Sequence, residues 1–427
     1  MDVREIVPLA QAPDATIRVP GSKSYTNRAL ALAALARGRS VLRGALFSDD
    51  TRYMAESLRG LGLAVEDDAS ACTFAVEGCD GRLGQAHASA YVGLAGTAAR
   101  FLPGIMALGT GEYELDGNAR MRQRPLSPLL DALTELGADV RYLGEPGCLP
   151  IRIRGTGLSG GCISMRGDQS SQLISGLLIS APYMGEGLTL QVEGELVSRP
   201  YVEMTRRAMS TFGAEVEITD EGAYRVAPGQ RYAGQDYAVE PDASAASYFF
   251  AAAAICGGRV RIEGLGSDSL QGDLELVHAL ERMGCRVQQD ASSTELWGPA
   301  DGVLCGLEID MSQISDTAQT LAVVAPFACS PTRITGIGFI RRKETDRVGA
   351  VVRELGRLGI DAVEEEDGLV IQPGTPQPGQ VETYDDHRMA MAFALLGLRE
   401  PGIRIADPGC TSKTFPDYWD VLDQLRA

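Results

Sequence analysis

Lysine is scarce in this chain: only three of its 39 basic residues are lysines, and the others are arginines. Lys23, Lys343 and Lys413 each lie in a short polar cluster that also contains Ser, Thr, Asp or Glu. Lysine is a compact charge on a flexible stem and can lose its proton when desolvated, whereas the arginine guanidinium is rigid, planar and permanently charged. We therefore predict that these three positions need a group that a guanidinium cannot replace.

Histidine is equally rare, and paired cysteines are absent. The three histidines show no metal-ligand spacing, and the nine cysteines include no CxxC. This pattern predicts no metal site and reduced, buried thiols, as in a cytosolic protein. The start, MDVREIVPLA, lacks a basic stretch followed by an apolar run, and no apolar run is long enough to span a bilayer. We expect no signal peptide, no membrane partner and a cytoplasmic location.

Acidic residues are in excess, with 57 Asp and Glu against 39 Lys and Arg and a net charge of −18. This balance argues against a nucleic-acid partner. It leaves small anionic ligands open, because a cleft can be locally basic within an acidic shell. At 427 residues the chain is too long for one ordinary core, so two or more domains are expected.

One pattern recurs six times along the chain. A polar cap is followed by a helix of small apolar residues, then by Gly, then by a short alternating strand that ends near another Gly. The first five closing glycines lie between 70 and 77 residues apart, at Gly44, Gly117, Gly194, Gly264 and Gly336. A repeat at a fixed period indicates repeated structural modules.

A second pattern lies between these copies: an amphipathic helix that ends in Gly and is followed by a strand. Its glycines are Gly62, Gly137, Gly213, Gly284 and Gly359. Glycine just after a helix is typical of the left-handed C-terminal cap. We predict α/β modules of about 70 residues and two domains of three modules, 22–239 and 1–21 plus 240–427, with the chain crossing twice at a hinge. The N-terminal strands are expected to complete the short sixth module.

Polar clusters mark the starts of the buried helices or lie near them, where free N–H groups and the positive end of the helix dipole attract anions. Asp242 we interpret as a helix cap. Together the clusters predict a site for one or two multiply charged anions that carry phosphate or carboxylate groups. Asp316 and Glu344 within them are either structural counter-ions or general acid–base groups. The cluster residues are Lys23, Ser24, Arg28, Gly96, Thr97, Arg100, Arg122, Arg124, Ser170, Ser171, Gln172, Ser198, Tyr201, Asp316, Lys343, Glu344, Arg347, Asp386, His387, Arg388 and Lys413.

These motifs, in this order from Pro20 to Trp419, resemble those of the 5-enolpyruvylshikimate-3-phosphate synthase branch of the enolpyruvyl transferases. The matching stretches are PGSKSYTNRALALAAL, GLAGTAARF, MRQRP, SSQ, LVSRPYVEMT, DASAASYF, KETDR, DDHRMAM and DPGCTSKTFPDYW. The resemblance implies an α/β fold of two domains, each of three βαβαββ modules with buried helices.

The resemblance also implies an activity. Enzymes of this family transfer the enolpyruvyl group of phosphoenolpyruvate to the 5-hydroxyl of shikimate 3-phosphate, with release of phosphate. The reaction belongs to the shikimate pathway of aromatic amino-acid biosynthesis and is the target of glyphosate. No metal or organic cofactor is implied. The implied partners are the two small substrates, and a monomer is expected.

Roles follow from the resemblance motif by motif. The phosphate of phosphoenolpyruvate is assigned to Lys23, Gly96, Arg124, Gln172 and Lys413, and its carboxylate to Arg347 and Arg388. The phosphate of shikimate 3-phosphate is assigned to Ser170, Ser171, Ser198 and Lys343, with Gln172 beside them. Its carboxylate and ring are assigned to Ser24, Arg28 and Tyr201, and its hydroxyls to Asp316. Catalysis is assigned to Lys23, Asp316, Glu344 and Lys413.

The sequence departs from the family at Leu94, Phe101, Phe339 and Arg199, where Asn, Pro, Asn and Lys are usual. Two alternatives remain open. A UDP-N-acetylglucosamine enolpyruvyl transferase would share the fold and the donor, but the stretch GTGEYELDGNARMRQRP lacks the reactive cysteine usual there. A non-catalytic anion-binding scaffold would need neither Asp316 nor Glu344.

Overall fold

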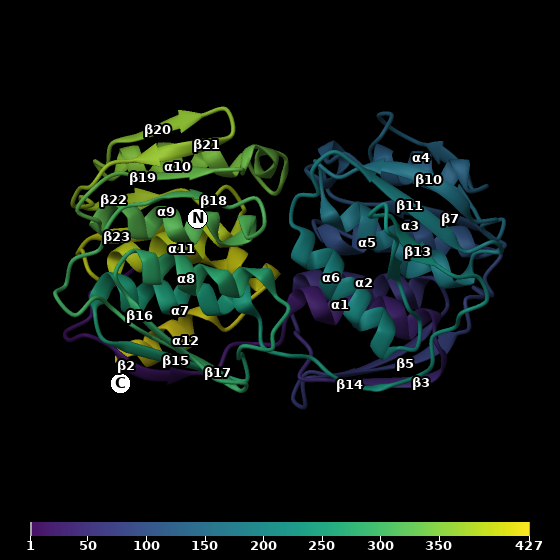
Figure 1. Cartoon of the computed structure of the whole chain (residues 1–427), viewed down its shortest axis with the longest axis horizontal. Helices are drawn as coiled ribbons and strands as arrows, with labels where there is room; N and C mark the ends of the chain where they lie inside the picture. Colours follow the sequence, from purple (N-terminus) through teal and green to yellow (C-terminus); the bar gives the residue numbers. More distant parts are fainter. Residues whose placement is uncertain (1, 427) are drawn as a thin grey trace. The chain divides into compact units, whose positions relative to one another are not determined.

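The computed structural model describes residues 2–426 and divides into two compact units (Figure 1). The first unit is Gly21–Glu240, and the second unit combines Met1–Pro20 with Pro241–Ala427. Each unit has its own buried apolar core. The chain therefore leaves and re-enters the second unit, at Pro20–Gly21 and at Glu240–Pro241.

The first unit contains three four-stranded sheets, ordered β14-β3-β5-β4, β6-β7-β9-β8 and β10-β11-β13-β12. Their strands are β3 (Arg37–Arg43), β4 (Ala64–Asp68), β5 (Thr73–Cys79), β6 (His87–Tyr91), β7 (Glu112–Asp116), β8 (Asp139–Tyr142), β9 (Ile151–Arg154), β10 (Gly161–Arg166), β11 (Leu188–Glu193), β12 (Glu217–Ile218), β13 (Tyr224–Val226) and β14 (Asp236–Ala238).

The second unit also contains three sheets, ordered β16-β17-β15-β2, β18-β19-β21-β20 and β1-β23-β22. Their strands are β1 (Val3–Glu5), β2 (Asp14–Ile17), β15 (Arg259–Glu263), β16 (Arg286–Gln289), β17 (Ser293–Trp297), β18 (Glu308–Asp310), β19 (Thr332–Thr335), β20 (Ala362–Glu365), β21 (Gly368–Ile371), β22 (Gly379–Val381) and β23 (Ile403–Ala406).

Every four-stranded sheet has the same set of pairings. The pair at one end of the sheet is parallel, and the other two pairs are antiparallel. Parallel neighbours need a crossover, and in three of these sheets a buried helix supplies it directly: α3 (Gly96–Leu108) joins β6 to β7, α5 (Ser171–Ser180) joins β10 to β11, and α9 (Ala318–Val324) joins β18 to β19. The expected repeat of βαβαββ modules is thereby confirmed.

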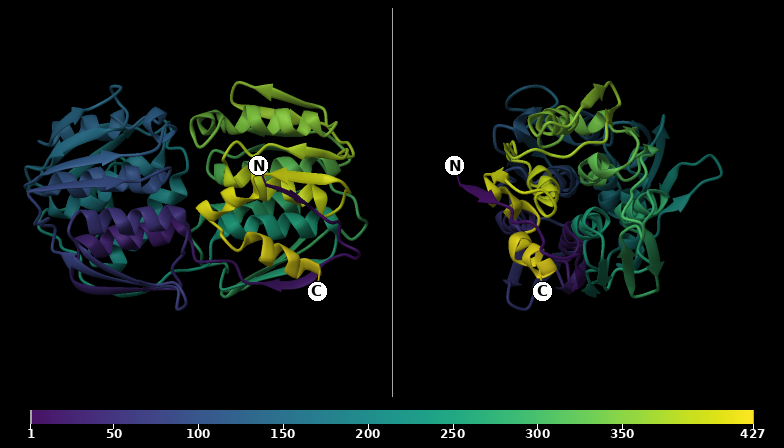
Figure 2. Two further views of the ribbon diagram at one scale, coloured as in Figure 1. Left: turned by 180° about the vertical axis from the view of Figure 1, so that it is seen from behind. Right: turned by 90° about the vertical axis from the view of Figure 1, so that its left-hand side faces the viewer.

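At the two crossings between the units, one strand on each side pairs with a sheet that does not contain its next neighbour in sequence. β2 directly precedes helix α1 (Lys23–Leu35) of the first unit but pairs with β15 of the second. β14 directly precedes helix α7 (Ala243–Cys256) of the second unit but pairs with β3 of the first. The prediction that the N-terminal segment completes the sixth module is therefore half wrong. Only β1 joins that sheet, beside β23, and Figure 2 shows this purple strand against the yellow C-terminal segment.

Helices of two kinds follow one another along the chain. The first kind is buried on nearly every face because its side chains are small, as in Ala243–Cys256. These helices are α1 (Lys23–Leu35), α3 (Gly96–Leu108), α5 (Ser171–Ser180), α7 (Ala243–Cys256), α9 (Ala318–Val324) and α11 (His387–Gly397). The second kind is half-buried: α2 (Asp49–Gly60), α4 (Ser127–Glu135), α6 (Arg199–Thr211), α8 (Leu276–Arg282), α10 (Arg347–Arg357) and α12 (Tyr418–Asp423).

The predicted glycine caps of the half-buried helices are confirmed. Gly62, Gly137, Gly213, Gly284 and Gly359 have φ values of 89°, 105°, 99°, 112° and 77°. A left-handed residue here turns the chain from the helix into the next strand, and glycine adopts it without steric cost.

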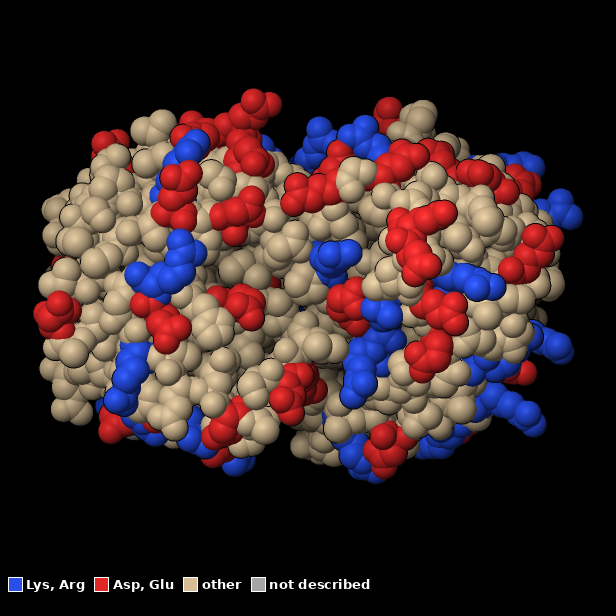
Figure 3. Space-filling model, in the orientation of Figure 1, with Lys and Arg blue, Asp and Glu red and all other residues tan. Residues whose placement is uncertain are grey.

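Charged side chains of both signs mix over the surface shown in Figure 3. Many form exposed pairs across neighbouring strands, such as Arg43 with Asp236 at 2.7 Å. Over residues 2–426, no helix is long and apolar enough to cross a membrane. The nine cysteines are free, but the prediction that they are buried is wrong for Cys72, Cys162, Cys305 and Cys329, which are exposed because they stand on turns and outward strand positions.

Candidate functional site

The polar cluster PGSKS forms the first turn of α1 in the first unit. Ser22 caps the helix, since its Oγ accepts a hydrogen bond from the backbone N–H of Tyr25 at 3.4 Å. The Nζ atom of Lys23 lies 3.3 Å from the carboxylate of Asp50 in the first turn of α2. Asp50 is nearly fully buried, so it fixes the direction of the Lys23 side chain. Sequence reasoning missed Asp50, because an acid at a helix start is usually a cap.

Arg28 is buried one turn further along α1. Its guanidinium donates hydrogen bonds to the hydroxyl of Thr205 at 2.7 Å and to the carbonyls of Ser24 and Tyr201 at 2.9 and 2.8 Å. It also lies against the rings of Phe101 and Tyr201, at 5.5 and 5.8 Å from the ring centres. Burial lowers the pKa of Arg28 to about 10. All these partners are neutral hydroxyls, carbonyls and rings.

The starts of α3 and α5 meet beside this arginine. A Cβ on Gly96 would lie 3.0 Å from both terminal nitrogens of Arg124, so glycine leaves room for that guanidinium. The side chain of Gln172 donates to the hydroxyl of Thr97 at 3.4 Å. Ser170 caps α5 by accepting from the Gln172 backbone N–H at 3.3 Å. Four of the predicted phosphate ligands, Gly96, Arg124, Ser170 and Gln172, therefore lie at or beside two neighbouring helix starts.

Other candidates of the first unit take different positions. Ser198 has left-handed backbone angles, φ 53° and ψ 41°, and is buried at the start of α6. Ser171 is buried as the first residue of α5. Arg100 is buried and donates to the carbonyls of Gly96 and Pro125, so it fixes the two segments that carry Gly96 and Arg124. Arg122 instead forms an exposed pair with Asp116 and does not join the group.

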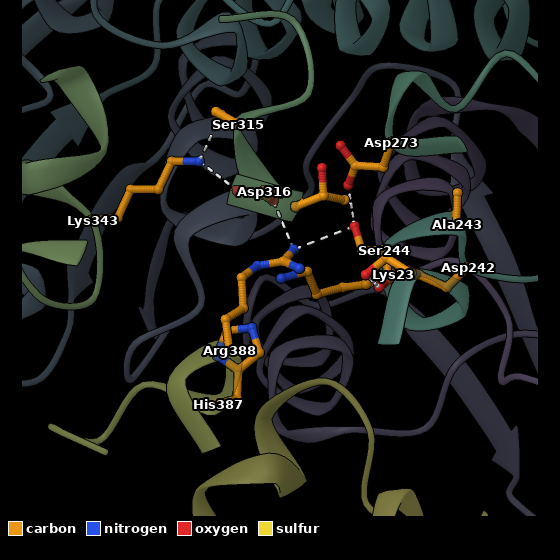
Figure 4. Close-up of polar contacts among 12 residues, drawn as sticks. Lys23, Asp242, Ala243, Ser244, Asp273, Ser315, Asp316, Lys343, His387 and Arg388 are labelled. Carbon is orange, nitrogen blue, oxygen red and sulfur yellow. Dashed lines mark hydrogen bonds and ion pairs between the residues drawn. The ribbon is translucent and has the colours of Figure 1, made fainter. Parts of the chain in front are cut away.

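Asp316 lies at the centre of the polar group of the second unit (Figure 4). It stands in a single 3₁₀ turn, Ser315–Thr317, that leads into the buried helix α9. Its carboxylate contacts the Nζ atom of Lys343 at 2.5 Å and the guanidinium groups of Arg347 at 3.3 Å and Arg388 at 2.7 Å. Arg388 also donates to the hydroxyls of Ser244 and Tyr248. One carboxylate thus balances three of the predicted anion-binding cations.

Arg347 joins this group to two further carboxylates. Its Nε atom lies 2.7 Å from Asp386, and one terminal nitrogen lies 2.8 Å from Glu344. Burial lowers the pKa of Arg347, but the charges of Asp386, Glu344 and Asp316 outweigh this effect and raise the pKa above its ordinary value. Asp386 also caps α11 by accepting from the Arg388 backbone N–H at 2.9 Å. Sequence reasoning quoted Asp386 within DDHRM but gave it no role.

Glu344 and Lys413 form a further contact between a carboxylate and a lysine in this group. The Nζ atom of Lys413 lies 3.8 Å from one carboxylate oxygen of Glu344, whose other oxygen faces Arg347. Both side chains are less than one-tenth exposed. A carboxylate shared between a lysine and an arginine can exchange a proton while it keeps a counter-ion.

The group contains both cations and carboxylates. Its four cations, Lys343, Arg347, Arg388 and Lys413, face three carboxylates, Asp316, Glu344 and Asp386. Burial lowers the pKa of Lys343, although Asp316 opposes this effect. Asp385 is a further carboxyl near Lys413 and Glu344, and burial together with the charge of Asp407 raises its pKa.

Two of the departures from the family pattern contact predicted site residues. The ring of Phe101 packs against the Arg28 guanidinium, and the ring of Phe339 lies 5.6 Å from the Nζ atom of Lys343. Both are cation–π contacts, which hold a cation without neutralising it. Leu94 packs on the core of the first unit. Within residues 2–426, no group of three or more His, Cys, Asp or Glu is arranged to hold a metal ion.

Comparisons with known proteins agree with the sequence motifs. The family described as EPSP synthase (3-phosphoshikimate 1-carboxyvinyltransferase) matches residues 10–422. Proteins named 3-phosphoshikimate 1-carboxyvinyltransferase are similar along nearly their whole length. The one from Nostoc punctiforme is 49% identical and covers 100% of this chain and 99% of its own. That from Nostoc sp. is 48% identical and covers 98% of each.

The fold agrees as well. The solved structure of EPSP synthase from Acinetobacter baumannii superposes with a TM-score of 0.82 at 25% identity and covers 100% of this chain and 98% of its own. The predicted two-domain architecture and the predicted family are thereby confirmed. The chain belongs to the EPSP synthase family.

Proposed function

We propose that this protein transfers the enolpyruvyl group of phosphoenolpyruvate to the 5-hydroxyl of shikimate 3-phosphate and releases phosphate. The observation that carries this proposal is the match to 3-phosphoshikimate 1-carboxyvinyltransferases over the full length of the chain. The polar groups of the two units add support, because both substrates are multiply charged anions and both groups gather cations. The alternative acceptor, UDP-N-acetylglucosamine, has no support among these matches.

Shikimate 3-phosphate carries a carboxylate that suits Arg28. In our proposal Arg28 binds that carboxylate with Ser24 and Tyr201 beside it. The buried guanidinium supports this assignment, because its contacts are with hydroxyl and carbonyl oxygens and aromatic rings. A buried cation of this kind gains most from an anionic ligand. The phosphate of the same substrate is assigned to Ser170, Ser171, Ser198, Gln172 and Lys343.

Phosphoenolpyruvate is assigned to the other cations. Arg347 and Arg388 would hold its carboxylate, and both are buried and close to Asp316. Negative charge grows on the phosphate as it leaves, and preorganised cations stabilise that charge at no further cost in reorganisation. The groups assigned to this phosphate are Lys23, Gly96, Arg124, Gln172 and Lys413.

The reaction proceeds by addition and then elimination. In the addition, the 5-hydroxyl loses its proton to a base and its oxygen bonds to C2 of phosphoenolpyruvate, while the C3 methylene gains a proton. In the elimination, the resulting methyl group loses a proton and the C2–O bond to phosphate breaks. Glu344 is our candidate for the proton at C3, with Lys413 and Lys23 next to the leaving phosphate and Asp316 on the acceptor hydroxyl. Glu344 suits this role because it is buried and contacts Lys413.

Asp316 forms ion pairs with Lys343, Arg347 and Arg388 and neutralises them in part. A substrate anion then competes with Asp316 for the same donors. We further propose that the units act as domains, 22–239 and 1–21 plus 240–427, connected by a hinge at the two crossings, in a monomeric cytoplasmic enzyme.

The test is phosphate release from phosphoenolpyruvate by the purified protein. Release that depends on shikimate 3-phosphate, and that is absent with UDP-N-acetylglucosamine, supports the proposal. Release with the nucleotide sugar instead supports the sister activity, and release with neither supports a binding protein. Arg28→Lys serves as a site variant, because a lysine cannot reproduce the four-donor contact. We expect its KM for shikimate 3-phosphate to rise about tenfold or more, and its KM for phosphoenolpyruvate to change much less.

A further inference from the structure

Cys305 and Cys329 lie next to each other in the second unit, outside the polar group described above. The segments that carry them run in parallel. Leu304 pairs with Ala328 in an isolated parallel bridge, and the backbone N–H of Cys329 donates to the carbonyl of Leu304 at 2.7 Å. Further along, the same two segments become the parallel strands β18 and β19.

The register of this bridge brings the two cysteines side by side. Cys305 directly follows Leu304 and Cys329 directly follows Ala328, so the two cysteines are neighbours across the pair of segments. Side chains alternate along extended chain, and here Leu304 and Ala328 are buried at 1% and 5% exposure whereas both cysteines are exposed. The two thiols therefore point outward on the same face.

The spacing of paired strands suits a disulfide. Neighbouring strands lie about 4.7–4.9 Å apart, and disulfides join residues whose Cα atoms are about 4.4–6.8 Å apart. The thiols also interact with each other, since a hydrogen bond and charge from Cys329 raise the pKa of Cys305.

We propose that Cys305 and Cys329 form a reversible disulfide in the folded protein. The oxidant is a low-molecular-weight disulfide. The thiolate of one cysteine attacks this disulfide and releases one small thiol, and the thiolate of the other cysteine then displaces the second small thiol from the mixed disulfide. Two protein thiols lose two electrons and two protons, and the oxidant gains them as two small thiols.

The new bond would close the loop from residue 305 to residue 329. This loop contains the turn Ser315–Thr317 with Asp316 and the buried helix α9. A crosslink that closes a loop stabilises the fold chiefly by restricting the unfolded chain. Oxidation should therefore make the second unit harder to unfold and keep the Asp316 turn in place at higher temperature.

The experiment treats the folded, full-length protein with oxidised glutathione and compares it with protein kept in dithiothreitol. We expect the number of titratable thiols in denaturant to fall by two and a digest without reductant to contain the linked peptides of Cys305 and Cys329. The melting temperature should rise by about 5 °C or more and return after reduction.

Variants distinguish this pair from the other exposed thiols. Cys305→Ser and Cys329→Ser should each abolish the linked peptide and the thermal shift, while Cys72→Ser and Cys162→Ser, at exposed positions of the first unit, should keep both. The proposal is overturned if the pair stays reduced, if each cysteine carries only glutathione, or if the thermal shift persists in Cys305→Ser.

Discussion

The carboxylate of Asp316 lies 2.7 Å from the guanidinium of Arg388 and also contacts Lys343 and Arg347. Removing this charge should strengthen the binding of simple anions and weaken catalysis. For Asp316→Asn we expect inorganic phosphate to bind about tenfold more tightly, because the local positive charge rises by one. We expect kcat to fall by about 10²-fold or more, because the carboxylate that we propose for the acceptor hydroxyl is lost.

Calorimetric titration with phosphate and steady-state kinetics check this prediction. The control is Asp14→Asn, which removes an exposed carboxylate of the same unit that pairs with Arg259. Unchanged phosphate affinity in Asp316→Asn would mean that Asp316 does not compete with the ligand.

Glu344→Gln tests the acid–base role. Glutamine keeps the size of the side chain and a hydrogen bond to Arg347 but cannot carry the proton. We expect kcat to fall by about 10²–10⁴-fold with both KM values nearly unchanged. Glu364→Gln, an exposed partner of Arg341, is the control. If the kcat of Glu344→Gln stays within about threefold of the parent value, Glu344 is only a counter-ion.

The three lysines should resist replacement by arginine. Lys23→Arg and Lys413→Arg should lower kcat by about tenfold or more, since a wide planar group would displace the leaving phosphate. Lys343→Arg should mainly raise KM for shikimate 3-phosphate, because Lys343 stands between Asp316 and the ring of Phe339. The control is Arg18→Lys, at an arginine with 85% side-chain exposure, which should leave kcat and both KM values unchanged. Parent-like kinetics in all three lysine variants would contradict the argument drawn from lysine scarcity.

Gly96→Ala should affect the donor site. The new Cβ would stand 3.0 Å from the Arg124 guanidinium, which must shift by a few tenths of an ångström. We expect KM for phosphoenolpyruvate to rise about 3- to 30-fold with a smaller change in kcat, and glyphosate, which competes with this substrate in the family, to lose more affinity. The control is Gly84→Ala, where a Cβ meets nothing within 4 Å. Inhibition by glyphosate that is not competitive with phosphoenolpyruvate would contradict this placement.

Glu354 should prove to be a positioning residue. It is fully buried and accepts hydrogen bonds from the hydroxyl of Tyr384 and the backbone N–H of Glu382. These residues lead directly into Asp386 and Arg388, through Tyr384 and Asp385, which both have φ 56°. Glu354→Gln places an amide N–H against one of these donors, so we expect the free energy of unfolding to fall by about 1–3 kcal/mol.

The KM for phosphoenolpyruvate should rise in the same variant, which a purely structural role would not require. Denaturant titration and kinetics provide the two measurements. Arg357→Gln removes the half-exposed partner of Glu354 and should cost less than about 1 kcal/mol. An unchanged KM in Glu354→Gln would leave Glu354 with a role in stability alone.

Local patterns predicted most of the fold. Buried helices such as Ala243–Cys256 were recognisable because nearly every residue is small and apolar, and the cap glycines because they follow amphipathic runs. The pairing of β2 was not predictable, since a strand carries no local mark of its partner. Its place with β15, and that of β14 with β3, depends on where the chain crosses between the units.

The types of residue at the site came from motifs, but their partners did not. Lys23 contacts Asp50, which lies 27 residues further along the chain, and Arg347 contacts Asp386, which lies 39 residues further along. Arg28 meets Ser175 and Thr205 across 147 and 177 positions. Such contacts arise when separate buried helices pack together, so no short window of sequence contains them.

The sequence by itself determined the repeated α/β modules, the family and the kinds of side chain at the helix starts, because these follow from periodicity and from motifs of adjacent residues. Only the tertiary structure decided which cations are already neutralised. Arg347 is paired with three carboxylates, whereas the buried Arg28 contacts hydroxyls, carbonyls and rings. The physical reason is that Coulomb energy depends on distance in space and on burial, and both are set by how the helices pack.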